Sequence, residues 1–191
     1  MKKFITICLV LIAASTTYAA TIQSITANNA ATSFNSTTGL FSMIGSGGIV
    51  EYTSGNAYIN GQFTLSMSLA ADTSASGIAK GTFNSGTFSY NDGSTLLLAG
   101  SFSSFNIVES FDNFGMLAGY GNFNVTGGSL QSAFGSIGNL VNISFSVNPI
   151  TISSFASDFT AISHMTVTSV PEPATIAIIS LGVLSIFRKR K

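Results

Sequence analysis

Few side chains in this sequence of 191 residues could carry out acid–base or nucleophilic chemistry. His164 is the only histidine, and it lies in segment 163–167, whose alternation of apolar and polar residues predicts a strand. A Ser-His-Asp triad would use this histidine as its base and would place the serine on a Gly-x-Ser-x-Gly turn, which the sequence lacks. We therefore interpret His164 as a surface residue.

Glu109 and Asp112 are the only close pair of acidic residues. A glycosidase uses two carboxyl groups on either side of the sugar, but such pairs usually come from separate strands. Asn113 beside this pair, or Asn91 with Asp92, could supply oxygen ligands for Ca²⁺, although the repeating acidic loop of known Ca²⁺ motifs is missing. We interpret these acids as solvated loop residues, and we predict no catalytic residue, no metal ligand and no cofactor.

The elements that would position such residues have an unusual composition. Charged residues make up only 7% of the chain, where about 25% is usual. Lys80 is the only basic residue between positions 20 and 170, and six acids lie there, so this region has a net charge of −5. A negative body repels phosphate backbones, which argues against nucleic-acid binding. Apolar residues are scattered singly in this region and cluster only at the two ends of the chain.

The first 19 residues have the layout of a secretory signal peptide. Two lysines form a positive start, residues 4–14 are apolar but too short to span a membrane, and small residues precede a cleavage site between Ala19 and Ala20. We expect signal peptidase to cut there. The only cysteine, Cys8, would be removed, so the mature chain would have neither disulfides nor a cysteine nucleophile.

The C-terminal segment 170–191 combines a proline-containing motif, an apolar stretch and a basic end. The motif is Val170, Pro171, Glu172 and Pro173, and the basic end is Arg188, Lys189, Arg190 and Lys191. Residues 174–187 would form a helix of roughly 21 Å at 1.5 Å per residue, shorter than a hydrocarbon core of about 30 Å. Basic side chains can reach the cytoplasmic headgroups and stop transfer. We therefore predict one C-terminal transmembrane helix with the body outside the cytoplasm.

These features together resemble the PEP-CTERM sorting signal of Gram-negative bacteria, a family that pairs this tail with a secretory signal. The resemblance implies recognition by an exosortase, a membrane-embedded cysteine transpeptidase-like enzyme. Cleavage near Pro171-Glu172-Pro173 would then move a chain anchored in the inner membrane to the cell envelope or the extracellular matrix. A plain membrane anchor would give the same topology without processing. The resemblance covers the tail and says nothing about the body, residues 20–169.

The body has the pattern of an all-β domain. Segments 63–69 and 141–147 alternate apolar and polar residues with a period of two, and no amphipathic helix is evident. Asn60-Gly61 and Asn91-Asp92-Gly93 have the composition of tight hairpin turns. We expect strands on both sides of each turn.

A loose Gly-x-Phe repeat recurs in the body at intervals of about 20 residues. Its members are Gly61/Phe63, Gly81/Phe83, Gly100/Phe102 and Gly121/Phe123. This spacing suggests one hairpin, or one rung of a solenoid, per repeat. The hairpin turns favour an antiparallel sandwich or barrel-like meander, with a β-solenoid as the alternative, and we expect phenylalanines to fill the core.

Three functions agree with these patterns. The first is a non-enzymatic surface or matrix protein, structural or adhesive, in an exopolysaccharide setting, since small neutral polar residues suit contact with hydrated polymers. The second is a carbohydrate-binding module, which would need exposed tyrosines aligned on one face; the candidates are Tyr52, Tyr58, Tyr90 and Tyr120. The third is a secreted hydrolase that uses Glu109 and Asp112.

Overall fold

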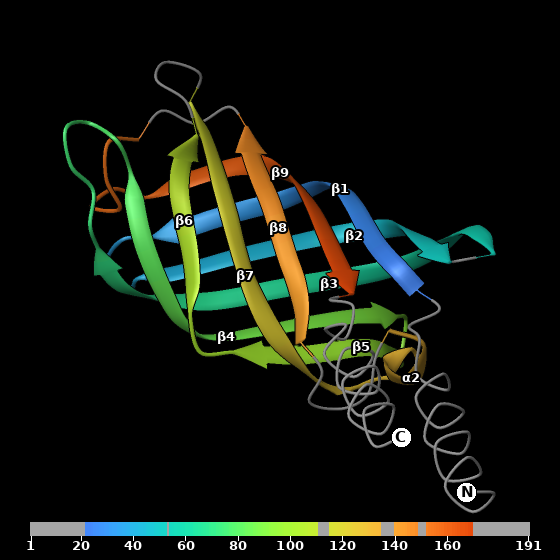
Figure 1. Ribbon diagram of the computed structural model, residues 1–191. Coiled ribbons are helices and arrows are strands. Elements are labelled where there is room, and N and C mark those ends of the chain that lie inside the picture. Colours follow the sequence, from blue (N-terminus) through green and yellow to red (C-terminus); the bar gives the residue numbers. More distant parts are fainter. Residues whose placement is uncertain (1–21, 53, 111–114, 135–139, 149–151, 170–191) are drawn as a thin grey trace, which may run out of the picture. The chain divides into compact units, whose positions relative to one another are not determined.

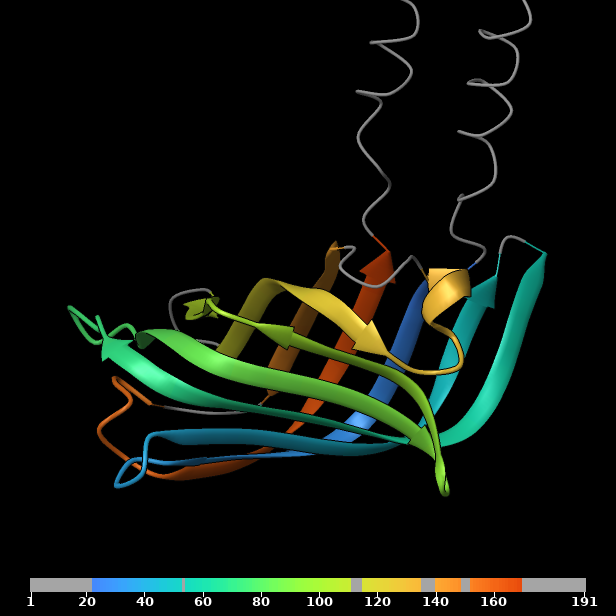
Figure 2. The same cartoon turned by 90° about the horizontal axis from the view of Figure 1, so that it is seen from below.

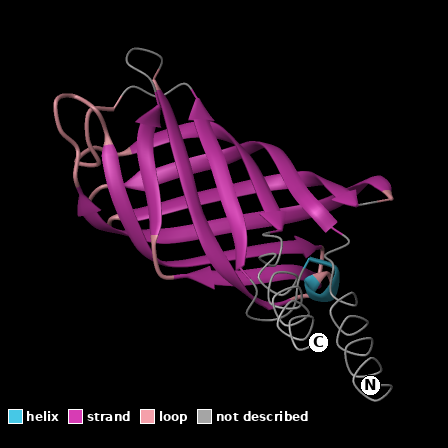
Figure 3. Ribbon diagram, viewed as in Figure 1, coloured by secondary structure: helices cyan, strands magenta, loops and turns pink. Residues whose placement is uncertain are grey.

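The described part of the chain forms nine strands where apolar residues alternate with small polar ones (Figure 1, Figure 3). The structure is a computed structural model, and it describes residues 22–52, 54–110, 115–134, 140–148 and 152–169. The strands are β1 (Ile22–Asn35), β2 (Leu40–Tyr52), β3 (Gly55–Asp72), β4 (Lys80–Asp92), β5 (Thr95–Phe102), β6 (Phe105–Ser110), β7 (Met116–Gly127), β8 (Leu140–Asn148) and β9 (Phe159–Ser169); one helical turn, α2 (Gln131–Phe134), follows β7.

Every pairing between these strands is antiparallel, and the sheet closes on itself. The order is β3-β2-β1-β9-β8-β7-β5-β4, and β3 also pairs with β4. Strands β5 and β6 share one position, because β4 pairs with β6 through 80–83 and with β5 through 86–92. The nine strands therefore make a barrel with eight strand positions. Figure 1 shows β6, β7 and β8 crossing in front of β1–β3, and Figure 2 shows these two walls edge-on.

This closure decides between the predicted architectures. The all-β antiparallel prediction is confirmed for the described residues, and its barrel form is the one observed. The β-solenoid alternative is wrong, because the rungs of a solenoid are parallel and these strands pair only in the antiparallel sense. The predicted signal peptide, the cleavage site at Ala19–Ala20 and the tail 170–191 lie outside the described residues.

One of the two predicted hairpin turns is correct. Strand β4 ends at Asp92, and Gly93 follows with a φ of 57° before β5 begins. The turn predicted at Asn60-Gly61 is wrong, since both residues lie inside β3. Gly61 is required there for space instead: the ring of Tyr90 crosses over it, and an added Cβ would lie 2.6 Å from a ring carbon.

The Gly-x-Phe repeat has a different structural meaning from the predicted one. The four repeats lie in four separate strands, β3, β4, β5 and β7. The first two intervals each correspond to one strand and its connection rather than to a hairpin, and the third also contains β6. In each repeat the glycine lies under an aromatic ring from another segment. The pairs are Gly61 with Tyr90, Gly81 with Phe155, Gly100 with Phe123 and Gly121 with Phe105. The repeat therefore marks positions where the missing side chain makes room for a ring.

Phenylalanines fill the interior, as predicted. Phe41 and Phe105 both stack on Phe145, each with ring centroids 5.4 Å apart. Phe34 and Phe83 meet edge to face at one end of the same cluster. Offset and edge-to-face contacts of this kind are worth about 0.5–1.5 kcal/mol each beyond the area that they bury. The aromatic cluster thus joins both walls of the barrel.

Polar groups inside the described part of the barrel are paired with one another. The hydroxyls of Thr32 and Ser163 are hydrogen-bonded across β1 and β9, and Ser163 Oγ also donates to the carbonyl oxygen of Ala30. Among the residues that the structure describes, no buried side-chain nitrogen or oxygen lacks a hydrogen-bond partner. The polar groups of this interior are therefore occupied by the fold itself.

Carboxylates at the ends of the strands hold the loops. Asp72 Oδ2 accepts a hydrogen bond of 3.0 Å from the backbone N–H of Phe155. Partial burial raises the pKa of Asp72, but hydrogen bonds from Ser74 and Phe155 outweigh it and leave the pKa below its ordinary value. Asp158 accepts bonds from the backbone and hydroxyl of Ser36, which also lower its pKa. These acids have structural partners in the loops.

The packing of rings on glycines can be tested at Gly100. A Gly100→Ala substitution would drive Cβ into the ring of Phe123, and we expect a loss of about 2 kcal/mol in the free energy of unfolding. The matched control is Gly127→Ala, where no atom lies within 4 Å of the added Cβ; we expect a change within about 0.5 kcal/mol. Urea unfolding followed by circular dichroism measures both, and equal stabilities would contradict the packing argument.

Candidate functional site

The residues whose types could support catalysis or metal binding do not form a catalytic group in the described structure. His164 is exposed on β9, and its Nδ1–H donates to Oδ1 of Asn28 rather than to a carboxylate. Glu109 Oε2 accepts a hydrogen bond of 3.1 Å from the backbone N–H of Ala79. Asp112 and Asn113 lie outside the described residues. Within the described ranges, no cluster of three His, Cys, Asp or Glu residues is placed to hold a metal ion.

The four candidate tyrosines do not line up on one face. Tyr90 is fully buried, so its predicted role as an exposed platform is wrong, and Tyr52 is half-buried against the core. Tyr58 is 70% exposed and Tyr120 is 54% exposed. They lie on β3 and β7, which are three strand steps apart by the shorter route through β4 and β6, and Figure 1 shows β7 in the wall in front of β3. Each exposed tyrosine must therefore be considered alone.

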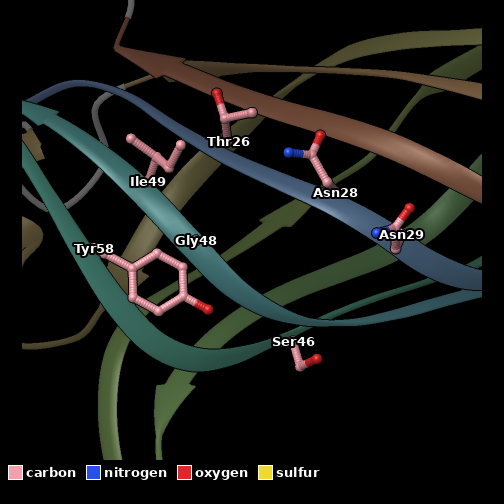
Figure 4. Close-up of a pocket in the computed structure, with 7 residues that line it drawn as sticks. All are labelled: Thr26, Asn28, Asn29, Ser46, Gly48, Ile49 and Tyr58. Carbon is pink, nitrogen blue, oxygen red and sulfur yellow. The ribbon is translucent and has the colours of Figure 1, made fainter.

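A pocket of about 240 Å³ opens on the outer surface next to Tyr58. It forms between β1 and β2, because the two strands pair at Thr26–Ile49 and again at Ala31–Ile44 but not in between. Each strand is also irregular there against its other neighbour, with a register shift at 27–30 in β1 and at 46–48 in β2. The lining residues are Thr26, Asn28, Asn29, Ser46, Gly48, Ile49 and Tyr58 (Figure 4).

The bulge in β1 places two amide side chains next to each other. Ala27 and Ala30 are buried, whereas Asn28 and Asn29 between them are both exposed, which breaks the usual alternation. Asn29 has a φ of 57°, a left-handed conformation that asparagine tolerates better than most residues. The contact with His164 holds Asn28 in place. The pocket thus has a polar side whose geometry is set by the backbone.

The floor of the pocket rests on Tyr90. Its hydroxyl lies beneath Gly48, where an added Cβ would be 2.7 Å from the oxygen, and it donates a hydrogen bond of 3.1 Å to the carbonyl oxygen of Ile59. One side chain of β4 therefore touches β3 and β2 as well. Burial, followed by the negative charge of Asp92, raises the pKa of Tyr90 to about 12.

The opposite side of the pocket is apolar. Ile49 and Tyr58 are directly paired across β2 and β3 and are 40% and 70% exposed. In Figure 4 these two side chains lie across the pocket from Asn28 and Asn29. No charged side chain lines the pocket. This site was not predicted from the sequence. The signal that could have indicated it is the Asn28-Asn29 pair, which interrupts the period-two pattern of β1.

The comparison with protein families concerns the other end of the chain. Residues 169–191 match the family model of the PEP-CTERM protein-sorting motif. The tail is a PEP-CTERM sorting motif. It includes the predicted motif at 170–173 and the basic end at 188–191, and it indicates an exported protein that an exosortase processes and that is sorted, membrane-anchored, to the cell envelope.

No curated protein and no solved structure matches the chain significantly. In the ranges that the structure describes, no helix has the length and apolar character needed to cross a membrane. The helix predicted at 174–187 lies outside these ranges, so the structure gives it no support.

The raised pKa of Tyr90 predicts that the folded protein loses stability at alkaline pH. The folded-state pKa of about 12 lies above the ordinary value of 10.0, so the folded protein retains a proton that the unfolded chain loses. The contribution of this proton to the free energy of unfolding is fully present below pH 10 and is lost as the pH rises from 10 to 12. We expect Tyr90→Phe to lose about 1 kcal/mol at pH 8, because the bond to Ile59 is absent, and to lack this alkaline step.

Urea unfolding between pH 8 and pH 12 measures this dependence. Tyr120→Phe is the matched control, since the side chain of Tyr120 on β7 is exposed, and this variant should show the same pH dependence as the wild type. An alkaline step that persists unchanged in Tyr90→Phe would show that another group causes it.

Proposed function

We propose that the protein is a non-enzymatic structural or adhesive component of the cell envelope or extracellular matrix, in an exopolysaccharide setting. The observation that carries this proposal is the outer surface of the barrel, which presents neutral hydroxyl and amide groups in continuous rows. The sorting motif adds the location, because it indicates export and transfer to the envelope.

One such row crosses six neighbouring strands. Its members, paired strand by strand, are Thr160, Ser33, Ser42, Ser66, Thr87 and Ser101. All six are exposed or half-exposed. Neighbouring hydroxyls bond to each other, as Ser33 does with Ser42 at 2.8 Å. Hydroxyls of this kind exchange hydrogen bonds with water or with sugar hydroxyls at little net cost, which suits contact with a hydrated polymer.

The charged groups of the body support a non-enzymatic role. Asp72, Asp158 and Glu109 accept hydrogen bonds from backbone N–H groups of the loops. Glu51 accepts a bond of 2.6 Å from the hydroxyl of Ser24 on the neighbouring strand. A hydrolase would need two carboxyl groups that are available to the substrate. Four of the five acids in the described ranges therefore have partners within the fold; the fifth is Asp92, which is exposed at the end of β4.

The processing that we propose has two steps. Signal peptidase cuts between Ala19 and Ala20 during export through the inner membrane. An exosortase then cuts near Pro171-Glu172-Pro173 and releases the body, residues 20–169, from its tail anchor. The final location of the body is the envelope or the matrix outside the cell.

Mass spectrometry of the envelope-associated protein tests the processing. We expect a mature species that begins at Ala20 and lacks residues 174–191. Replacement of Pro171, Glu172 and Pro173 by alanines should leave the complete tail on a chain retained in the inner membrane. Thr168→Ala, just before the matched residues, is a control that should be processed normally. A mature wild-type species that still ends at Lys191 would show that the tail acts only as an anchor.

Complementation tests the non-enzymatic role. Deletion of the protein should weaken the cohesion of the extracellular matrix under shear, and the wild-type chain should restore it. We expect equal restoration by the double variant Glu109→Gln and Asp112→Asn, because glutamine can still accept the hydrogen bond from Ala79. A double variant that reaches wild-type levels but fails to restore cohesion would favour the hydrolase.

A further inference from the structure

We propose that the pocket between β1 and β2 binds a single neutral sugar ring of a polysaccharide, with Tyr58 as the stacking surface. The proposal rests on the proposed function, since it requires the body to meet a polysaccharide outside the cell. It adds a defined site and a substrate class to a surface that would otherwise make only distributed contacts.

The polar side of the pocket has the right groups for sugar hydroxyls. A sugar hydroxyl both donates and accepts hydrogen bonds, and the amides of Asn28 and Asn29 offer both functions. Thr26 and Ser46 are two further polar residues of the lining. No charged group lines the pocket, and the only basic residue of the body, Lys80, begins β4 and is not among the lining residues. A uronate, sulfate or phosphate group would therefore find no counter-charge there.

The apolar side has the right shape for the C–H face of a sugar. Tyr58 leaves 70% of its surface exposed, so among the described residues its ring is open to a ligand. Its ring is rigid and carries a polar tip, so it can cover an apolar face at low entropic cost while the hydroxyl stays in water. Ile49, directly paired with Tyr58, extends the same wall.

The size of the pocket limits the ligand to one ring at a time. A volume of about 240 Å³ is below the roughly 300–1,000 Å³ of pockets that enclose a drug-sized ligand. The pocket also opens to the outer surface of the barrel, so a polymer chain can continue beyond the bound ring (Figure 4). These properties favour, as the ligand, one sugar unit of a long polysaccharide over a free small molecule.

The pocket is formed before any ligand arrives. His164 holds Asn28, and the hydroxyl of Tyr90 fixes the floor under Gly48. The positive φ of Asn29 sets the direction of its side chain. Binding therefore needs little ordering of the protein, which reduces the entropic cost of association.

Calorimetric titration of the purified full-length chain in detergent micelles tests the proposal. The probes are three neutral hexasaccharides (cellohexaose, maltohexaose and mannohexaose) and one acidic hexasaccharide, hexagalacturonate. We expect at least one neutral probe to bind, and hexagalacturonate to bind more weakly than that probe. No binding by any neutral probe, or a preference for hexagalacturonate, would overturn the proposal.

Matched variants locate the binding. Tyr58→Ala should raise the dissociation constant for the neutral probe about tenfold, which corresponds to a loss of ~1.4 kcal/mol in binding free energy. Tyr120→Ala removes another exposed tyrosine, on the opposite wall, and should leave the dissociation constant unchanged. Asn29→Gly keeps the backbone conformation but removes the amide, and we expect about fivefold weaker binding. Equal effects of the two tyrosine variants would place the binding elsewhere.

The binding experiments and the complementation experiments distinguish a failure of the pocket proposal from a failure of the proposed function. A protein that binds no sugar, but whose deletion strain is still weakened and restored by complementation, would refute the pocket alone. A protein that binds the neutral probe through Tyr58 but makes no contribution to matrix cohesion would retain the site and refute the structural role. Circular dichroism of Tyr58→Ala, which alters an exposed side chain, should show the wild-type fold in both cases.

Discussion

The contact of aromatic rings with glycines on neighbouring strands is the interaction on which this structure depends. The core is built largely from phenylalanine, and such rings need space that a sheet with a Cβ at every position would not leave. Glycines at Gly61, Gly81, Gly100 and Gly121 supply this space on four different strands. Rings can then pack close to the backbone and reach both walls, which lets the sheet curve and close.

The same core also shapes the outer surface. Because alternate residues of each strand face inward, the remaining positions are free to carry serine, threonine and asparagine. Tyr90 connects the two faces: its ring packs on Gly61, and its hydroxyl lies under Gly48 at the floor of the pocket. Tyr90 thus links the packing of the core to the floor of the pocket. The bulges in β1 and β2 occur where these two strands separate and leave the pocket between them.

The two parts of the chain contribute different information about function. The tail specifies a destination, since its motif indicates exosortase processing and sorting to the envelope. The body carries few charges, and the described acids at 51, 72, 109 and 158 accept hydrogen bonds within the fold. The surface that faces partners therefore carries mostly uncharged hydroxyl and amide groups, and the pocket beside Tyr58 lies on it. This combination suits contact with an uncharged hydrated polymer better than catalysis.

The sequence by itself determined the strand-rich fold class, the turn at Asn91-Asp92-Gly93 and the sorting tail, because each depends on residues that are close together in the chain. Tertiary structure decided the closure of the barrel, the burial of Tyr90 and the placement of Asn60-Gly61 inside β3. It also placed Tyr58 and Tyr120 on opposite walls and opened the pocket between β1 and β2. These features depend on which distant strands pair and which ring covers which glycine, and a local pattern of alternation specifies only the faces of a strand, not its neighbours.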